Sequence, residues 1–508
     1  MTLSWIIGLP LLGALLVGLL PQERFAKVQA LLVSVLVFLF SLKFYFNFDL
    51  YDGGFQFQEN LEILPSLGLR YAVGLDGISL WFVLLTAFLT PLVVAGSFGE
   101  KRPHHRGFYA CLLALEALLL GAFTATDLFL FYLFWEGVLL VLYFLFRFFG
   151  GAHRVQATLQ LVLVTLTASV LMLAGLLMIA QEAHTLDYSR LFDEFLPEDI
   201  QIWCFLAFTA AFLIQIPLAP FHAWLSDASA EAPLSGSIYL SALLTPLSIY
   251  GLVRYCVPLF PFAAKAFAPW ILVLALASIW HGGLRSILET DMKRLAAYLA
   301  FSQTGLVVLG LFDFSLMGFQ AGLLQTLSLS LTLSGLYFLL GMLMDRRGSR
   351  SLDHYGGLAQ RAPWLAAAFL GILLAAIGFP GFGNFIGQFL ILIATYRVSS
   401  VIALAAVATV LFSAWCLITL YGKVFGGPLK PHGKNHDLSI REGLLILPLL
   451  LMALFIGWSP DTFLRPMEKS IQLNVIDRLK PPPAMMDFAV QQRHLQDAAN
   501  QDREMHSR

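Results

Sequence analysis

The stretch GFPGFGNFIGQFLIL, from Gly378 to Leu392, interrupts one long apolar run and starts another. Pro380 and the glycines around it should stop a helix, because proline cannot donate a backbone hydrogen bond and clashes with the preceding turn. Gln388 places an amide in the apolar sequence just beyond this break. A break of this kind, deep in apolar sequence, is typical of a membrane-spanning helix that lines a polar cavity.

The composition agrees with a membrane setting. Of the 508 residues, 58% are hydrophobic and only 12% are charged, which indicates an integral membrane protein surrounded by lipid. The net charge of -1 gives no support for nucleic-acid binding. The sequence contains no glycine-rich phosphate loop, CxxC pair or HExxH motif, so we expect no metal, no small-molecule cofactor and no catalytic centre.

Stretches of roughly 20 mostly apolar residues predict an all-α fold of about 14 membrane-spanning helices. These spans are expected at 3–20, 27–47, 78–98, 107–125, 127–148, 158–181, 202–224, 234–258, 268–288, 295–313, 316–344, 363–395, 400–424 and 442–460. No polar linker separates them, so residues 1–460 are expected to form one membrane domain. Residues 461–508 are expected to form a polar, solvent-exposed C-terminal tail.

The loops between these spans predict the orientation, because lysine and arginine favour the cytoplasmic side. Alternate loops carry the basic residues Lys101, Arg102, Arg106, Arg147, Arg154, Lys293, Arg294, Arg346, Arg347, Arg350, Arg361, Lys423, Lys430 and Lys434. We expect this side to be cytoplasmic. An even number of spans then places both termini on the non-cytoplasmic side.

A second break lies in AFLIQIPLAPFHAWL, which contains Pro217 and Pro220. The two breaks fall in spans 7 and 12, five spans apart. This spacing predicts two five-helix repeats, spans 4–8 and spans 9–13, within a core of about residues 107–425. Because each repeat has an odd number of helices, the second repeat should be inverted relative to the first.

Five motifs carry a resemblance to a known family: VGLDGISLWFVLLTAFLTPLVV, LFLFYLFWEGVLL, IPLAPFHAWLSDASAEAP, ETDMKRLAAY and GFPGFGNFIGQF. From about Tyr71 to Trp458, the sequence resembles the antiporter-like subunits M (chain 4) of NADH-quinone oxidoreductase, respiratory complex I. The resemblance implies a proton-translocating subunit without a redox centre. It also implies other membrane subunits as partners and a location in a bacterial inner membrane.

The resemblance also implies where a proton relay would lie. Glu136 stands at the family's span-5 glutamate, while Gln160 and Gln215 stand at its span-6 and span-7 lysines. Pro246 falls near the span-8 lysine, Leu329 near the span-11 histidine, and Gln388 replaces the span-12 glutamate. Only Glu136 can ionise, so we expect proton pumping by this chain to be impaired or lost. Losing charges of both signs avoids leaving one buried charge unpaired.

Three further residues are candidates for a proton pathway. Glu116 is a second acid within an apolar run and could share a polar layer with Glu136. His222 follows the span-7 break and could either move protons or cap the carbonyls that the break frees. Lys293 could take part in transport, although a cytoplasmic positive-inside anchor is the favoured interpretation.

Three functions therefore remain open at the level of sequence. The chain could be a fully pumping complex I subunit with a compensated pathway. It could be a member of such a complex that pumps little or not at all. It could also be the membrane partner of another protein in an ion- or bicarbonate-uptake complex. Neutralisation of the relay positions favours the second.

Overall fold

The computed structural model describes residues 3–19, 23–64, 69–99, 105–193, 196–430 and 436–480. Its first half contains α1 (Ser4–Leu19), α2 (Glu23–Phe46), α3 (Ser79–Gly96), α4 (His105–Thr124), α5 (Leu128–Phe149), α6 (Arg154–Ala183), α7 (Tyr188–Asp193), α8 (Glu198–Gln215), α9 (Ala223–Glu231), α10 (Leu234–Tyr239), α11 (Thr245–Gly251) and α12 (Val257–Leu259). Two π-helical segments, Leu240–Leu244 and Leu252–Cys256, join α10, α11 and α12 into one rod.

The second half contains α13 (Pro261–Leu288), α14 (Met292–Leu311), α15 (Leu316–Arg347), α16 (Pro363–Ile377), α17 (Gly383–Val398), α18 (Ser400–Ala406), α19 (Ala408–Phe425), α20 (Ile440–Trp458), α21 (Asp461–Ile471) and α22 (Asp477–Leu479). Short 3-10 turns cover Ser97–Gly99, Leu352–His354 and Leu358–Gln360. A π-helical segment, Gln472–Ile476, separates α21 from α22.

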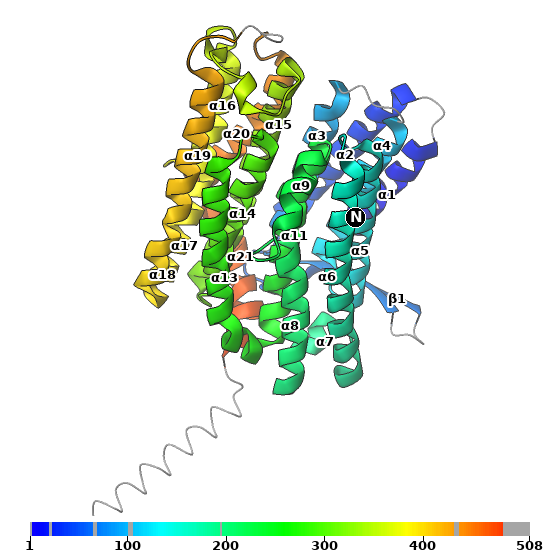
Figure 1. Ribbon diagram of the computed structural model, residues 1–508. Helices are drawn as coiled ribbons and strands as arrows, with labels where there is room; N and C mark the ends of the chain where they lie inside the picture. Colours follow the sequence, from blue (N-terminus) through cyan, green and yellow to red (C-terminus); the bar gives the residue numbers. More distant parts are fainter. Residues whose placement is uncertain are drawn as a thin grey trace, which may run out of the picture.

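The predicted helical membrane fold is confirmed. Within the described ranges, twelve helical segments are long and apolar enough to cross a membrane. The two predicted spans that this criterion leaves out contain shorter apolar helices, α1 and α16. Figure 1 shows the helices running side by side along the long axis of the molecule.

The basic loops gather at one end of the bundle, drawn at the top of Figure 1. Backbone bonds tie these loops together: Gly151 N donates to Glu231 O at 2.8 Å, and Gly357 N donates to Gly426 O at 2.7 Å. Arg346 joins the same end by donating to both carboxylate oxygens of Glu442. The predicted basic residues Lys101, Arg102 and Lys434 lie outside the described residues.

One pattern of backbone hydrogen bonds occurs twice and supports the predicted inverted repeat. Near α7, Leu128 N donates to Leu186 O at 2.9 Å and Tyr188 N donates to Thr126 O at 3.0 Å. At the basic end, Met292 N donates to Arg350 O at 3.1 Å and Leu352 N donates to Thr290 O at 3.0 Å. The second four residues follow the first four at one constant interval along the chain. Since α7 lies at the bottom of Figure 1 and the basic loops at the top, the two copies lie at opposite ends of the bundle.

Both predicted helix breaks are present. The helix of span 7 ends at Gln215 and resumes at Ala223, with Pro217 and Pro220 between, while that of span 12 ends at Ile377 and resumes at Gly383, with Pro380 between. Protein groups satisfy part of the freed backbone at the first break. Trp224 Nε1 donates to Ile214 O at 3.1 Å, and Ala219 N donates to Ser278 Oγ at 2.8 Å.

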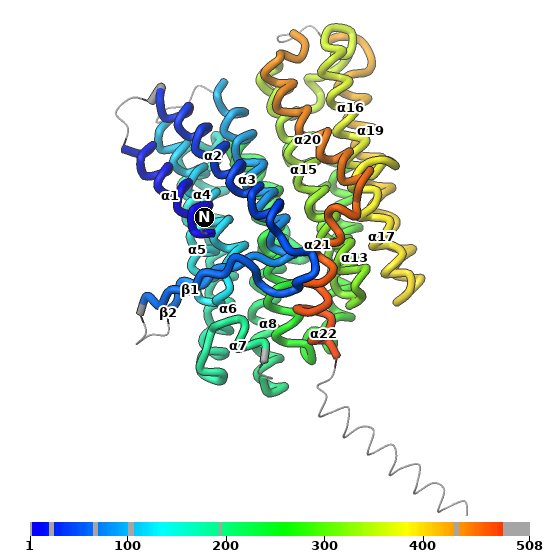
Figure 2. The backbone as a smooth tube through the Cα atoms, turned by 180° about the vertical axis from the view of Figure 1, so that it is seen from behind, coloured from blue at the N-terminus to red at the C-terminus, as the bar shows by residue number. Residues whose placement is uncertain are grey.

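A β-hairpin that the sequence analysis did not predict crosses the end of the bundle away from the basic loops. Strand β1 (Gln56–Leu64) pairs antiparallel with β2 (Leu69–Leu75). The hairpin joins the start of α5, because Thr126 N donates to Ala72 O at 3.0 Å. Figure 2 shows the hairpin reaching out past α5 from the vicinity of α21.

The expected solvent-exposed tail needs correction for its first part. Residues 461–479 are helical, and Phe463, Met467 and Ile471 are buried. These apolar residues recur every four positions and form one face of α21, so the helix packs although most of its residues are polar. Scanning for continuous apolar runs misses such a helix. The rest of the predicted tail, 481–508, lies outside the described residues.

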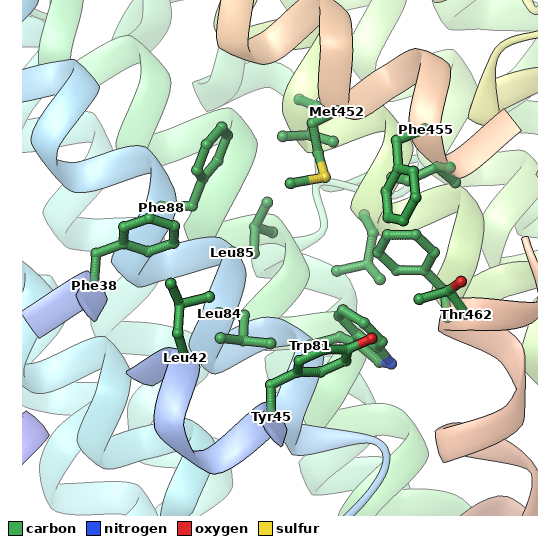
Figure 3. A pocket seen from close by; sticks show the side chains of 14 residues that line it. Phe38, Leu42, Tyr45, Trp81, Leu84, Leu85, Phe88, Met452, Phe455 and Thr462 are labelled. Atoms are coloured by element: carbon green, nitrogen blue, oxygen red, sulfur yellow. The ribbon is translucent and has the colours of Figure 1, made fainter. Parts of the chain in front are cut away.

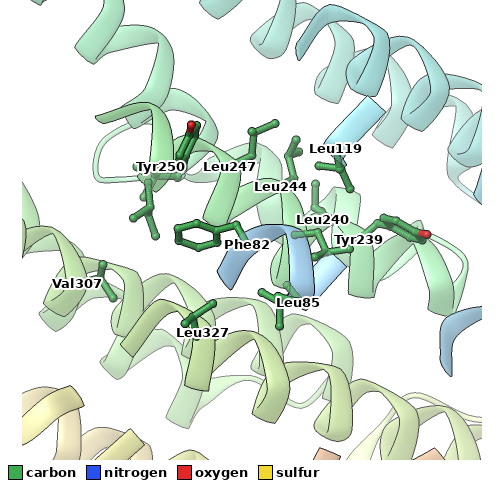
Figure 4. Packing of buried hydrophobic residues seen from close by; sticks show 14 of the residues in the cluster. Phe82, Leu85, Leu119, Tyr239, Leu240, Leu244, Leu247, Tyr250, Val307 and Leu327 are labelled. Atoms are coloured by element: carbon green, nitrogen blue, oxygen red, sulfur yellow. The ribbon is translucent and has the colours of Figure 1, made fainter. Parts of the chain in front are cut away.

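The core lies around span 8, whose apolar window from α10 to α12 is completely buried. Helices α3, α4, α8 and α15 surround it, and Figure 4 shows the packed side chains of the core. The labelled residues there are Phe82, Leu85, Leu119, Tyr239, Leu240, Leu244, Leu247, Tyr250, Val307 and Leu327. This core fixes the helices that carry the polar side chains described next.

Candidate functional site

Gln388 belongs to a buried group of amide and hydroxyl side chains, which we name the glutamine cluster: Gln303 on α14, Gln325 on α15, Gln388 on α17 and Ser413 on α19. The Oε1 atom of Gln303 accepts from Gln388 Nε2 at 3.2 Å and from Gln325 Nε2 at 3.4 Å. Its Nε2 atom donates to Ser413 Oγ at 2.8 Å. Gln303 is therefore the centre of the cluster and joins four helices.

The break between α16 and α17 makes room for this cluster. Gly378 ends α16 with a φ of 89°, a conformation that glycine adopts without the strain of other residues. A Cβ atom at this position would overlap the side-chain amide of Gln388. Near the same break, Asn384 Nδ2 donates to Ala375 O at 2.9 Å, which satisfies a carbonyl near the end of α16.

The chemistry of the cluster is that of hydrogen bonding alone. Amide and hydroxyl side chains exchange hydrogen bonds but do not gain or lose protons near neutral pH. Sequence reasoning found Gln388 but missed Gln303 and Gln325. The signal that could have found them is the same one: each is an amide within an apolar run, in AFSQTGLVV and GLLQTLSL.

Glu136 lies on α5 and faces α6. Its carboxylate accepts a short hydrogen bond from Ser169 Oγ, and the Tyr132 hydroxyl lies 3.3 Å from the same Oγ. The side chain is half-buried, and no ion pair involves it among the described residues. Ser169 and Tyr132 were not predicted, since neither residue type stands out in an apolar helix.

The two other glutamines of the predicted relay lie apart from Glu136. Gln160 is half-buried near the start of α6, nine residues before Ser169, which corresponds to roughly 14 Å of helix rise. Gln215 is the last residue of α8, where it is 1% exposed. Its amide has no hydrogen-bond partner among the described residues. The structure therefore does not join these two glutamines to Glu136 by hydrogen bonds.

Glu116 is completely buried on α4, and neither carboxylate oxygen has a hydrogen-bond partner among the described residues. Its environment includes Tyr239, whose hydroxyl donates instead to Leu112 O at 3.1 Å. Burial without a partner disfavours an ionised carboxylate. Glu116 is thus separate from the Glu136–Ser169–Tyr132 group.

His222 at the start of α9 pairs with a second histidine. The two Nε2 atoms of His222 and His281 lie 3.0 Å apart, and the His222 ring stacks on Phe301 with centroids 4.7 Å apart. One of the carbonyls that the break frees, Ile214 O, accepts from Trp224 Nε1. The histidine pair could share one proton, since one neutral ring accepts what the other donates.

Lys293 is buried at the basic end of the bundle, where the favoured interpretation as a cytoplasmic anchor stays a prediction. Its side chain is 5% exposed, and Nζ donates to Ala232 O at 2.7 Å and to Ser237 Oγ at 3.3 Å. Ala232 caps the C-terminus of α9, where a cation is favourable because carbonyls point outward. Neighbouring Arg294 is the exposed member, paired with Asp227 at 2.8 Å.

Hydroxyl groups extend the surroundings of Lys293 inward. Ser237 Oγ donates to Ser229 O at 3.1 Å, and Ser229 Oγ lies 2.8 Å from the Tyr337 hydroxyl. Ser241 Oγ donates to the same hydroxyl at 3.3 Å. These residues come from α9, α10, α15 and the π-helical segment Leu240–Leu244, and they form a polar group in the basic half of the bundle.

The last two relay positions are apolar in the structure as in the sequence. Pro246 follows the π-helical segment Leu240–Leu244 and is buried in the span-8 rod. Leu329 packs with Ala300 and Leu333 in a small apolar cluster. Neither residue offers a hydrogen bond or a charge to a relay.

The chain is similar in sequence to known membrane proteins. Residues 125–413 match the family described as NADH:quinone oxidoreductase/Mrp antiporter, TM. The chain is 35% identical over 475 residues to NADH-ubiquinone oxidoreductase chain 4 of Marchantia polymorpha, covering 92% of this chain and 96% of that relative. It is 33% identical over 479 residues to NADH-quinone oxidoreductase subunit M of Rickettsia prowazekii, covering 92% and 98%.

Solved structures agree. A chain of respiratory complex I from Thermus thermophilus with bound NADH superposes with a TM-score of 0.87 at 30% identity, covering 94% of this chain and all of that one. A chain of the Mrp complex from Dietzia sp. shares the fold, with a TM-score of 0.84 at 21% identity and coverage of 94% and 97%. The sequence motifs, the twelve apolar helices and these matches together show that the chain belongs to the NADH:quinone oxidoreductase/Mrp antiporter family of membrane proteins.

Proposed function

We propose that this membrane subunit fills the place of subunit M in a multisubunit NADH-quinone oxidoreductase, with its own proton transfer impaired or lost. The similarity to subunit M over most of the chain supports the place. The glutamine cluster supports the impairment. At the break of span 12, where the sequence motif implies a glutamate, Gln388 is bonded into a group made only of amides and a hydroxyl.

A titrating side chain can drive a conformational switch, because a buried charge pair changes in energy by several kcal/mol when one partner loses its charge. Decisive switching needs about 5 kcal/mol of preference for one state. A hydrogen bond between amides contributes about 1 kcal/mol net. The glutamine cluster can therefore hold helices together, but it supplies no charge that a neighbouring site could sense.

The remaining ionisable groups do not replace the relay under this proposal. The carboxylate of Glu136 is held by Ser169, and Lys293 is held by the C-terminus of α9. NADH oxidation and quinone reduction belong to other subunits of the complex, and the partners of this chain are other membrane subunits. A bacterial inner membrane, with both termini non-cytoplasmic, belongs to the same proposal.

Proton uptake into vesicles that contain the complete complex tests the proposal. We expect Glu136→Gln to change the ratio of protons taken up to NADH oxidised by less than about twofold, because under this proposal Glu136 takes no part in a working relay. A twofold change corresponds to well under 1 kcal/mol. Glu182→Gln is the matched control, since Glu182 is an exposed acid at the end of α6. Copurification of the redox subunits establishes that each variant is assembled.

Two results would contradict the proposal in different ways. A loss of uptake of about tenfold or more in assembled Glu136→Gln, with Glu182→Gln unaffected, would show that Glu136 works in a functioning relay. Copurification of wild-type chain with components of an ion- or bicarbonate-uptake system, and with no redox subunit, would assign the chain to a different complex.

A further inference from the structure

We propose that the chain binds one glycerophospholipid in two adjoining cavities between α2 and α3 on one side and α15, α20 and α21 on the other. The first cavity is apolar and would take an acyl chain. The second is polar and would take the phosphate. Both cavities are lined by Tyr45 and Thr462, so a single amphipathic molecule can occupy the two together.

The apolar cavity has a volume of about 240 Å³. An apolar cavity of about 150 Å³ is already large enough to accept a benzene-sized guest. Figure 3 shows aromatic and aliphatic side chains surrounding the space. The lining consists of Phe38, Leu42, Tyr45, Trp81, Leu84, Leu85, Phe88, Leu327, Leu331, Met452, Phe455, Ile456, Thr462 and Phe463. A hydrocarbon chain matches this lining, and water does not.

The polar cavity has a volume of about 570 Å³ and opens beside the ends of α2 and α20. Hydroxyls of Tyr45, Ser459 and Thr462 line it together with the guanidinium of Arg465. Asp461 also lines it and lies 3.8 Å from Arg465, a separation too long for a hydrogen bond, and both side chains are 72% exposed. The guanidinium therefore keeps donors for a phosphate, which it can bind with two parallel hydrogen bonds.

The order of these groups along the membrane normal matches a lipid. Tyr45 is the penultimate residue of α2, Trp81 is in the first turn of α3, and Thr462 comes shortly after the end of α20. These three residues therefore lie near one surface of the bundle, where tyrosine and tryptophan favour the interface of a bilayer. Phe38, Phe88 and Met452 lie further along their helices toward the middle. Figure 3 shows the same separation within the cavity.

One unpartnered donor belongs to a residue that lines the apolar cavity. Trp81 Nε1 is buried and has no hydrogen-bond partner among the described residues. An indole N–H without an acceptor is costly in a buried site. The ester carbonyl of a phospholipid, at the junction between acyl chain and headgroup, supplies an acceptor at this depth. A phosphate-free isoprenoid would fill the apolar cavity but leave Arg465 without an anion.

Native mass spectrometry of the delipidated complex, titrated with phosphatidylglycerol or with phosphate-free diacylglycerol of the same acyl chains, tests the proposal. Wild type should retain one phosphatidylglycerol more tightly than any diacylglycerol. Leu42→Trp fills the apolar cavity and should abolish this retained molecule, and Met452→Trp provides a second, independent block. Leu39→Trp is the control for Leu42→Trp, because Leu39 is 54% exposed on the same helix.

The headgroup has its own pair of variants. Arg465→Gln should weaken phosphatidylglycerol binding about tenfold or more, since the loss of one hydrogen bond between charged groups already has about that size, and should leave diacylglycerol binding unchanged. Lys469→Gln, an exposed cation on the same helix and outside the cavity lining, should have no effect. Equal retention of phosphatidylglycerol and diacylglycerol by wild type, or undiminished retention in both cavity-filling variants, would overturn the proposal. Retention of a phosphate-free isoprenoid in their place would also overturn it.

Discussion

At the scale of single residues, the span-12 break places one glycine, Gly378, directly against the side-chain amide of Gln388. Gly378 turns the chain with a positive φ, and the amide of Gln388 fills the space where a side chain at 378 would lie. Gln388 in turn donates to Gln303, the centre of the glutamine cluster. The break and the cluster are therefore one structural unit, because the Gln388 amide fits only if residue 378 has no Cβ atom.

This coupling predicts that Gly378→Ala destabilises the chain more than backbone strain alone. A left-handed conformation costs a non-glycine residue about 1–2 kcal/mol. Gly381→Ala is the matched control, because Gly381 also has a positive φ, 102°, but no atom within 4 Å of its Cβ position. We expect Gly378→Ala to cost about 1 kcal/mol more, the value of the displaced Gln388 hydrogen bond. The measurement is thermal release of the chain from the detergent-solubilised complex.

A double variant checks the cause. In a Gln388→Ala background the overlap disappears, so the extra cost of Gly378→Ala over Gly381→Ala should vanish. An extra cost that persists in this background would mean that Gln388 is not the group displaced.

The same residues show what sequence reasoning can reach. A proline with glycines in an apolar run predicts a break, because the cause is local to the chain. Gln388 was noticed because it stands beside that break. The other two glutamines of the cluster, Gln303 and Gln325, come from two other helices, and their meeting depends on helix rotation and packing, which one sequence does not display. The isolation of Gln215 and the burial of Lys293 escaped for the same reason.

At the scale of elements, α21 closes the end of the bundle away from the basic loops. Phe463, Met467 and Ile471 are buried beneath it, and the Gly77 N–H donates to Ser470 Oγ at 2.9 Å. The following π-helical segment contributes Asn474, whose Nδ2 donates to Asp76 at 3.3 Å. Asp76 also pairs with Arg254 inside the core at 2.5 Å. The element that was expected to be a tail therefore covers a buried ion pair.

Truncation separates this element from the residues beyond it. A chain that ends after Trp458 loses the three buried apolar side chains of α21, each contributing about 1.5–3 kcal/mol, and uncovers the Asp76–Arg254 pair. We expect it to disappear from the assembled complex. A chain that ends after Lys480 keeps all of these contacts and should assemble like wild type. Immunoblots of the purified complex provide the measurement, and equal assembly of the two truncations would contradict the role given to α21.

The α21 helix and the hairpin also show where element prediction from hydropathy stops. A continuous apolar run predicts a span well, because every face of such a helix meets lipid or protein. The helix α21 is apolar on one face only, and strands β1 and β2 are short and mixed in character. Their apolar residues become visible as structure only when the surface they cover is known.

At the scale of the whole molecule, the two halves of the bundle differ in polar chemistry. The paired backbone bonds at the starts of α5 and α14 support two inverted repeats. The first half keeps a carboxylate at Glu136 on α5, whereas the second half has the glutamine cluster beside its helix break. A helix break whose polar side chains are amides is what we expect of a fold that is kept for assembly after its relay is lost, as proposed above.

The distribution of charge over the whole molecule predicts its orientation in the membrane. The basic loops converge at one end, and the hairpin and α7 lie at the other. Lysine and arginine in short loops favour the cytoplasmic side, because the machinery that inserts membrane proteins retains positive charge there.

We therefore expect Asp52→Cys, exposed beside the hairpin, to react with a membrane-impermeant thiol reagent on intact cells. Gln360→Cys, exposed among the basic loops, should react only after the membrane is opened. The native cysteines give little background, since Cys204, Cys256 and Cys416 are buried and Cys111 is partly buried. Labelling of Gln360→Cys but not of Asp52→Cys on intact cells would contradict this orientation and would mean that both termini lie in the cytoplasm.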